Sequence, residues 1–186
     1  CHEAGHALVA RSLPQTDPVH KVSIVGRGAA ALGYTLYRPE DDRFLHTRTA
    51  LQHAICCLLG GTLAEEIALG EVSDGCTSDL SRATEIAQRM VQDFGMSPVL
   101  GRLRYAGDGD AGRGASDRAF SEQTAREIDL EVRRIVDEAL EKAREVLLRR
   151  RDDLDRLAAR LIERETLNAE ELDELLGGPA AGVCRP

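Results

Sequence analysis

Three residues near the start of the chain have the types and spacing of a zinc peptidase site. The first six residues read CHEAGH, with two histidines four positions apart and a glutamate directly after the first. On a helix these histidines, His2 and His6, would share one face and could hold one zinc ion through their imidazole nitrogens. Glu3 would then stand beside the open coordination position, where a carboxylate can take a proton from a water molecule activated by the metal. The pattern predicts hydrolysis of peptide bonds.

This five-residue pattern can also arise by chance. The alternative is two histidines on the polar face of a short helix, with a glutamate beside them. Features further along the chain are needed to distinguish the two interpretations.

Length and composition bound the class of protein. The 186 residues carry a net charge of -8 and are 42% hydrophobic, which is enough for one well-buried domain. The acidic charge argues against nucleic acid as a partner, because phosphate backbones are bound by clustered Lys and Arg. No apolar run approaches the roughly 18 residues of a membrane-spanning helix, so we expect this stretch to be soluble.

The cysteines argue against a disulfide framework. They are odd in number and contain no C-x-x-C pair, so neither a structural zinc knuckle nor a set of disulfides is expected, and a reducing compartment is the natural environment. Two of them fall in an apolar helical run and should lie in the core. The five are Cys1, Cys56, Cys57, Cys76 and Cys184.

Two short segments after the motif helix have the composition of strands. The helix should end near Leu13, and residues 19–25 and 32–37 are rich in β-branched and aromatic residues, with a Gly-containing link between them. We expect a small antiparallel sheet. Its edge could bind a substrate as an added strand, or the hairpin could be purely structural.

A largely buried helix is predicted over residues 47–69, where apolar residues recur every three to four positions. It contains Gly60 and Gly61, each of which costs about 1 kcal/mol relative to Ala inside a helix. Close approach of another backbone would explain them.

The next helix should begin at Ser78-Asp79 and end before Gly95, with an apolar face that includes Leu80 and Phe94. Asp79 lies in its first turn, where an acid favours the helix dipole and can cap free N–H groups. That role needs no metal.

The sequence divides into two halves joined by a loop. Residues 1–100 bear the motif, residues 101–120 are rich in Gly and Asp and are predicted to form a flexible loop, and residues 121–177 are predicted to be helical. Together they would form one domain over residues 1–177, followed by a tail at 178–186. The expected fold class is mainly α with a small β element: a zincin-like HExxH helix domain followed by a helical carboxyl-terminal bundle.

Charge and capping patterns add detail to the helical half. Its first helix, over residues 121–148, should carry i,i+4 ion pairs such as Glu138 with Lys142. The charged run at 149–153 is interpreted as a solvated helix junction. Asn168 and Glu171 have the spacing of a capping box at the start of the last helix.

Several spaced motifs together resemble the proteolytic domain of FtsH-type ATP-dependent zinc metalloproteases, which are membrane-anchored AAA+ proteases. The matching stretches are HEAGHAL at residues 2–8, DPVHKV at 17–22, ALGYT at 31–35, LGG and AEEI within 59–67, and DL and AT within 79–84. The resemblance covers nearly the whole chain and is far more specific than the first motif alone.

The resemblance implies site residues beyond the motif. The third zinc ligand of that family corresponds to Asp79, and the acidic residue that matches Glu65 is expected to orient a ligand histidine. The loop before Asp79 departs from the family, because GCTSD stands where GASND is usual. Cys76 in this loop could compete for zinc, although a small residue in a tight loop is the simpler interpretation.

On this resemblance we expect a zinc-dependent endopeptidase, with one zinc ion per protomer and Glu3 as the base, that cleaves unfolded or membrane proteins delivered by an AAA+ ATPase ring. The chain starts with Cys and contains no G-x-x-x-x-G-K-[ST] phosphate loop, so ATP binding and the membrane anchor would belong to an upstream part. A homo-hexamer at the cytoplasmic face of a bacterial inner membrane, or in an organelle membrane, is implied. The alternatives are a catalytically silent helical assembly module and a stand-alone zinc peptidase.

Overall fold

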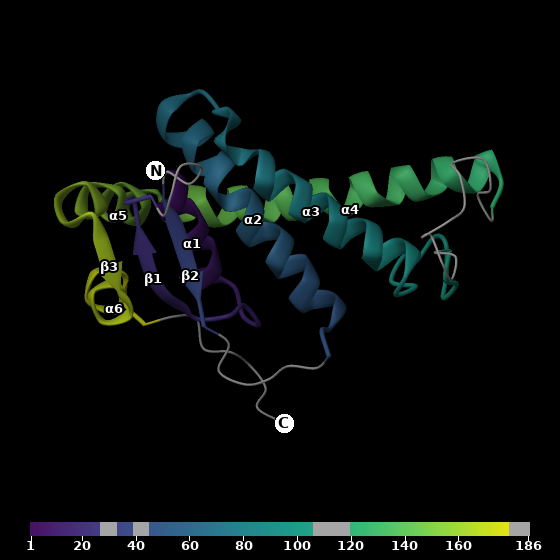
Figure 1. The fold of residues 1–186 in the computed structure, drawn as a ribbon, viewed down its shortest axis with the longest axis horizontal. Coiled ribbons are helices and arrows are strands. Elements are labelled where there is room, and N and C mark those ends of the chain that lie inside the picture. The colour runs from purple at the N-terminus through teal and green to yellow at the C-terminus, as the bar shows by residue number, and fades with distance from the viewer. Residues whose placement is uncertain (27–32, 39–44, 106–119, 179–186) are drawn as a thin grey trace.

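The computed structural model describes residues 1–26, 33–38, 45–105 and 120–178. Most of the predicted loop at 101–120 and of the tail at 178–186 lies outside these residues. In chain order the elements are α1 (His2–Ser12), β1 (Val19–Ser23), β2 (Tyr34–Tyr37), α2 (Arg48–Leu69), the 3₁₀ helix η1 (Asp74–Cys76), α3 (Thr77–Gln92), α4 (Glu122–Arg149), α5 (Arg151–Arg164), β3 (Thr166–Asn168) and α6 (Ala169–Leu176). The described part is mainly helical with a small sheet (Figure 1), which confirms the predicted fold class.

Helix α1 lies at the centre of the packing, because it contacts α2, β1 and β2, and its residues 4–11 are all buried. The contact with α2 depends on two glycines. A Cβ atom added at Gly5 would lie 2.2 Å from the Gly60 carbonyl oxygen, and one added at Gly60 would lie 2.9 Å from the Gly5 carbonyl oxygen. Close approach of another backbone is thereby confirmed as the reason for Gly60.

The sheet has the strand order β2-β1-β3, and both pairings are antiparallel. Val22 of β1 faces Thr35 on β2 and Leu167 on β3. The antiparallel pairing of β1 with β2 confirms the predicted sheet. Strand β3 was not predicted, because three residues from the far end of the chain give no periodic signal before tertiary structure pairs them with β1. In the part of the chain that the structure describes, β2 lies at one edge of this sheet.

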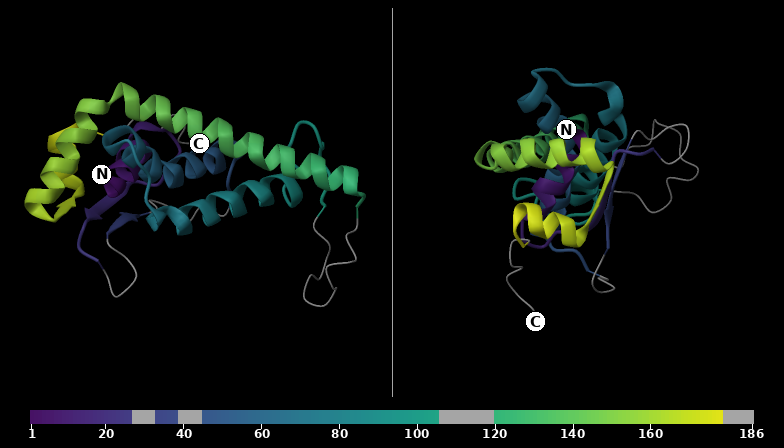
Figure 2. Two further views of the ribbon diagram at one scale, coloured as in Figure 1. Left: turned by 90° about the horizontal axis from the view of Figure 1, so that it is seen from above. Right: turned by 90° about the vertical axis from the view of Figure 1, so that its left-hand side faces the viewer.

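Helix α4 spans most of the long axis of the molecule, and α5 and α6 turn back beside the sheet (Figure 2). The capping box of α6 is confirmed, since Asn168 and Glu171 exchange both of its hydrogen bonds. The predicted ion pair between Glu138 and Lys142 is wrong: Glu138 lies 2.6 Å from Arg134, and Lys142 Nζ lies 2.8 Å from Nε2 of His53 on α2.

Two arginines fasten the carboxyl-terminal elements to the end of α1. Arg11 donates to Asp173 Oδ1 at 2.5 Å and to the Gly177 carbonyl oxygen at 2.6 Å. Arg150 donates to Ser12 Oγ at 3.1 Å and is only half-exposed, so the predicted solvated junction is wrong at this residue. The folded chain uses the junction to tie α4 to α1.

Helix α3 differs slightly from its prediction. It begins at Thr77, one residue early, and it ends at Gln92. Leu80 on this helix is 43% exposed and Phe94, just beyond it, is 44% exposed, although both were expected on the buried face. The buried side chains of α3 are Ala83, Ala87, Met90 and Val91. No helix in the described ranges is long and apolar enough to cross a membrane.

Candidate metal centre

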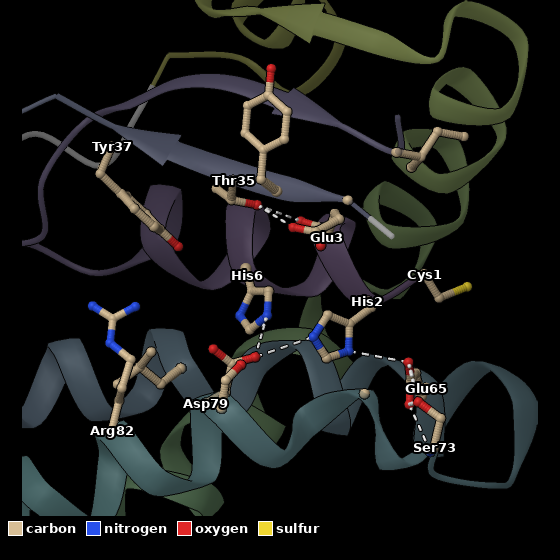
Figure 3. Close-up of a pocket in the computed structure, with 16 residues that line it drawn as sticks. Cys1, His2, Glu3, His6, Thr35, Tyr37, Glu65, Ser73, Asp79 and Arg82 are labelled. Carbon is tan, nitrogen blue, oxygen red and sulfur yellow. Dashed lines mark hydrogen bonds and ion pairs between the residues drawn. The ribbon is translucent and has the colours of Figure 1, made fainter. Parts of the chain in front are cut away.

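Two helices bring three potential metal ligands together (Figure 3). Helix α1 presents His2 and His6 one turn apart on one face, and the first turn of α3 presents Asp79. The Asp79 Oδ2 atom lies 3.3 Å from Nε2 of His2 and 3.2 Å from Nε2 of His6. One ligand atom from each residue lies within 4.8 Å of the other two.

This donor set fits zinc. Tetrahedral zinc takes imidazole nitrogens and carboxylate oxygens at about 2.0–2.2 Å, which places neighbouring ligand atoms about 3.3 Å apart. The carboxylate-to-imidazole separations of Asp79 therefore match the edge of such a tetrahedron. Three protein ligands also leave one position for water or substrate, as catalytic zinc sites require.

Each histidine is held through its second ring nitrogen. The Nδ1 atom of His6 lies 2.7 Å from the Cys57 carbonyl oxygen, so it carries the proton and donates it there. The Nδ1 atom of His2 lies 3.1 Å from Oε1 of Glu65, whose carboxylate also accepts a hydrogen bond from the Ser73 backbone N–H at 3.0 Å. Both contacts leave Nε2 free to face a metal ion.

Gly61 lies against the Nε2 atoms of the two imidazoles. A Cβ atom there would lie 2.5 Å from Nε2 of His6 and 2.7 Å from Nε2 of His2. The sequence suggested a nearby backbone, but the neighbours at this position are the ring nitrogens that face Asp79. Two adjacent glycines inside a helix predict a close neighbour, but the sequence does not show which group lies against each glycine.

The electrostatics keep both carboxylates of the site in their charged form. Burial acts to raise the pKa of Asp79, but hydrogen bonds from His2 and His6 outweigh it and hold that pKa well below its usual range. The hydrogen bond to Asp79 raises the pKa of His2 against the opposing effect of burial. Burial likewise acts to raise the pKa of Glu65, yet the Ser73 N–H and hydroxyl and the nearby His2 lower it overall. Both carboxylates are therefore ionised at neutral pH.

Glu3 lies on the sheet side of the same cluster. Its Oε2 atom accepts a hydrogen bond from the Thr35 hydroxyl of β2 at 3.0 Å. A Cβ atom at Gly33 would lie 2.8 Å from Cγ of Glu3, so a larger residue there would displace the carboxylate. Neither Thr35 nor Gly33 was predicted as a site residue, because only the folded hairpin brings them to α1.

The side chains of this cluster open onto one cavity of about 480 Å³. It lies between α1, the edge strand β2 and the first turns of α3 (Figure 3). The five residues expected at a zinc peptidase site all line it, and they are His2, Glu3, His6, Glu65 and Asp79.

Cys76 lies in the tight loop before α3. Cys76 is buried, and its Sγ donates to the Ser73 carbonyl oxygen at 3.2 Å. It is not part of the metal-ligand cluster found among the described residues, so it serves as a small residue in a tight loop. It also occupies the N-cap of α3, which has no side-chain cap hydrogen bond, while the Asp79 carboxylate turns to the histidines.

Comparison with known proteins gives one family. The model of peptidase family M41 matches residues 1–175. The chain is 51% identical to the "ATP-dependent zinc metalloprotease FtsH" of Syntrophobacter fumaroxidans over 99% of its own length, and it covers 29% of that protein. It is 49% identical to the FtsH protein of Methylococcus capsulatus and 50% identical to that of Pseudomonas putida, each over 94% of this chain. It covers 28% and 29% of those two proteins, so it spans less than a third of these relatives.

Proposed function

The chain belongs to peptidase family M41, and from that premise we propose that it is the proteolytic part of an ATP-dependent zinc metalloprotease. The observation that carries this proposal is the convergence of His2, His6 and Asp79 on one point, with Glu3 beside them in a cavity. The names of the matched relatives independently combine zinc, proteolysis and ATP dependence.

In the proposed mechanism His2, His6 and Asp79 hold the zinc ion. When bound, zinc supplies Lewis-acid chemistry, since it polarises a carbonyl group and lowers the pKa of water. Glu3 takes the proton from the attacking water and passes it to the leaving amine. The hydrogen bond from Thr35 holds the Glu3 carboxylate in place beside the first turn of α1 while the proton is transferred. Glu65 orients the His2 ring and takes no proton from the substrate.

The edge of the sheet suggests how a substrate would bind. Among the described residues strand β2 has a neighbour on one side only, and Thr35 and Tyr37 on this strand line the cavity. An unfolded segment that adds to this edge as a further strand would carry its backbone past Glu3. We propose unfolded and membrane proteins as substrates, delivered by the AAA+ ATPase ring of a membrane-anchored homo-hexamer at the cytoplasmic face of a bacterial inner membrane.

The test is the Glu3→Gln substitution. Gln is nearly isosteric with Glu but cannot accept the proton, so the variant should retain zinc and lose hydrolysis of an unfolded protein by at least about 100-fold. Both proteins are compared at equal zinc content. Glu170→Gln, an exposed change on α6, serves as the matched control and should cleave like the parent. Equal cleavage by parent and Glu3→Gln would show that Glu3 is not the base, and no zinc-dependent cleavage by the parent would instead favour a silent assembly module.

A further inference from the structure

The cavity contains a cation that the proposed hydrolysis does not use. Arg82 lies on α3 almost one turn after Asp79, and it lines the same cavity. Its guanidinium group reaches from α3 toward Tyr37 on β2, on the far side of the space from Glu65 (Figure 3). Among the described residues that line the cavity, Arg82 is the only Lys or Arg.

The charge of Arg82 is not compensated by any residue of the described chain. Arg89 on the same helix lies 3.9 Å from Asp93, whereas Arg82 is exposed and has no ion pair or hydrogen bond within the described ranges. The carboxylates that line the cavity are all held by other side chains, as described above, and they are Glu3, Glu65 and Asp79. A guanidinium in such a position is free to pair with an anionic group of a ligand.

The strand register gives the place of that group along a substrate. Thr35 contacts Glu3, and Tyr37 lies two residues further along β2, a distance of about 6.8 Å in an extended strand. A substrate strand bound along β2 with its cleaved bond beside Glu3 would therefore have another residue level with Tyr37 and Arg82. That residue is about two positions from the cleaved bond.

We propose that Arg82 is a specificity-determining residue that selects an Asp or Glu side chain about two residues from the cleaved peptide bond. This inference rests on the proposed peptidase function. The planar guanidinium can bind a carboxylate of the substrate through two parallel hydrogen bonds. A neutral Asn or Gln side chain in the place of that carboxylate would bind the guanidinium more weakly.

The experiment uses the complete native protein, loaded with zinc, and peptides capped at both ends so that side chains supply the only carboxylates. A single Glu is moved along the peptide one position at a time, with Gln and Lys at the same positions for comparison. At one position kcat/KM should be about three- to tenfold higher for Glu than for Gln, and lowest for Lys. Arg82→Gln should abolish this preference, and Arg82→Glu should reverse it in favour of Lys.

The matched control is Arg133→Glu on α4, which makes the same change of charge at an exposed position outside the cavity and should rank the peptides like the parent. Zinc content and helix content of all variants are measured alongside. A peptide ranking that stays the same in Arg82→Glu overturns the inference and leaves the proposed function intact. Absence of zinc-dependent cleavage of every peptide by the parent overturns the proposed function, and this inference with it.

Discussion

The Nδ1 atom of His2 lies 3.1 Å from Oε1 of Glu65, in a contact that joins the first turn of α1 to the last turns of α2. The Ser73 backbone N–H and hydroxyl bind the same carboxylate, so its position is fixed from two sides. Because the imidazole of His2 is already oriented by this contact, less conformational entropy is lost when a metal ion binds to it.

We therefore expect Glu65→Gln to lower zinc affinity by about 10- to 100-fold while the fold is kept. The amide retains part of the contact but loses the charge that makes His2 a better ligand. Zinc affinity is measured by competition with a chelator. Glu66→Gln is the neighbouring control, because Glu66 pairs with Arg144 on an exposed surface, where an ion pair contributes about 0–1 kcal/mol. Equal zinc affinity of parent and Glu65→Gln would remove Glu65 from the site.

Asp79→Asn tests ligation with little change to the helix. Asn is nearly isosteric with Asp, and Cys76 rather than Asp79 stands at the N-cap of α3, but Asn replaces an anionic oxygen ligand by a neutral amide. Zinc affinity should fall while helix content by circular dichroism stays the same. Asp74→Asn in η1 is the control, since Asp74 lies outside the metal-ligand cluster. Unaltered zinc binding by Asp79→Asn would return Asp79 to a purely structural role.

Gly61→Ala should damage the metal site more than the fold. The added methyl group would overlap the Nε2 atoms of His2 and His6, so the rings must turn away from Asp79. We expect a loss of most bound zinc and a stability cost of about 1–3 kcal/mol, typical of overpacking. Gly178→Ala, where a Cβ atom meets nothing within 4 Å, should change neither. Elemental analysis and thermal unfolding give the two readouts, and full zinc occupancy in Gly61→Ala would contradict the prediction.

The stability of the helical half should depend on pH through Glu131, which is only 4% exposed. Hydrogen bonds from Arg134 lower its pKa despite burial, and the Ser97 hydroxyl, 2.6 Å away, adds to the effect. Because the folded pKa lies below the unfolded value of about 4.3, the stabilisation is present above pH 4.3 and is lost as the pH falls through the folded pKa.

Glu131→Gln should accordingly lower the free energy of unfolding by about 1–3 kcal/mol at pH 7, and the difference from the parent should shrink in acid. Urea unfolding at pH 7 and at pH 3 measures it. Glu138→Gln removes an exposed carboxylate from the same Arg134 and should have little effect at either pH. If the difference in free energy of unfolding between the parent and Glu131→Gln were the same at both pH values, Glu131 would not be the source of the pH dependence.

The sequence predicts best where the signal is local. The motif helix, the capping box at Asn168 and Glu171, and the glycine contact at Gly60 all follow from residues a few positions apart or from one conformational preference. The same local rules failed at Lys142, because His53 on another helix offers a closer partner than Glu138 on its own helix. An i,i+4 rule considers residues of one helix only, so it cannot predict a contact between two helices.

The site shows the same division. His2, Glu3 and His6 form a pattern within five residues, and Asp79 and Glu65 could be named only from the resemblance. Thr35 carries no sequence signal for its role, since its hydroxyl becomes relevant only when β2 lies beside α1. The uncompensated charge of Arg82 is likewise a property of what surrounds it in the folded chain.

The pairing of β1 with β3 bears on the timing of assembly during synthesis. Strand β1 is completed by residue 23, but its second neighbour consists of residues 166–168, so a nascent chain leaves one edge of β1 open until nearly all of the domain has emerged from the ribosome. The proposed zinc ligands and Glu3 lie within the first 79 residues, yet the third strand of the sheet beside them comes from residues 166–168. A nascent chain that ends before residue 166 therefore contains every proposed site residue but not the complete three-stranded sheet.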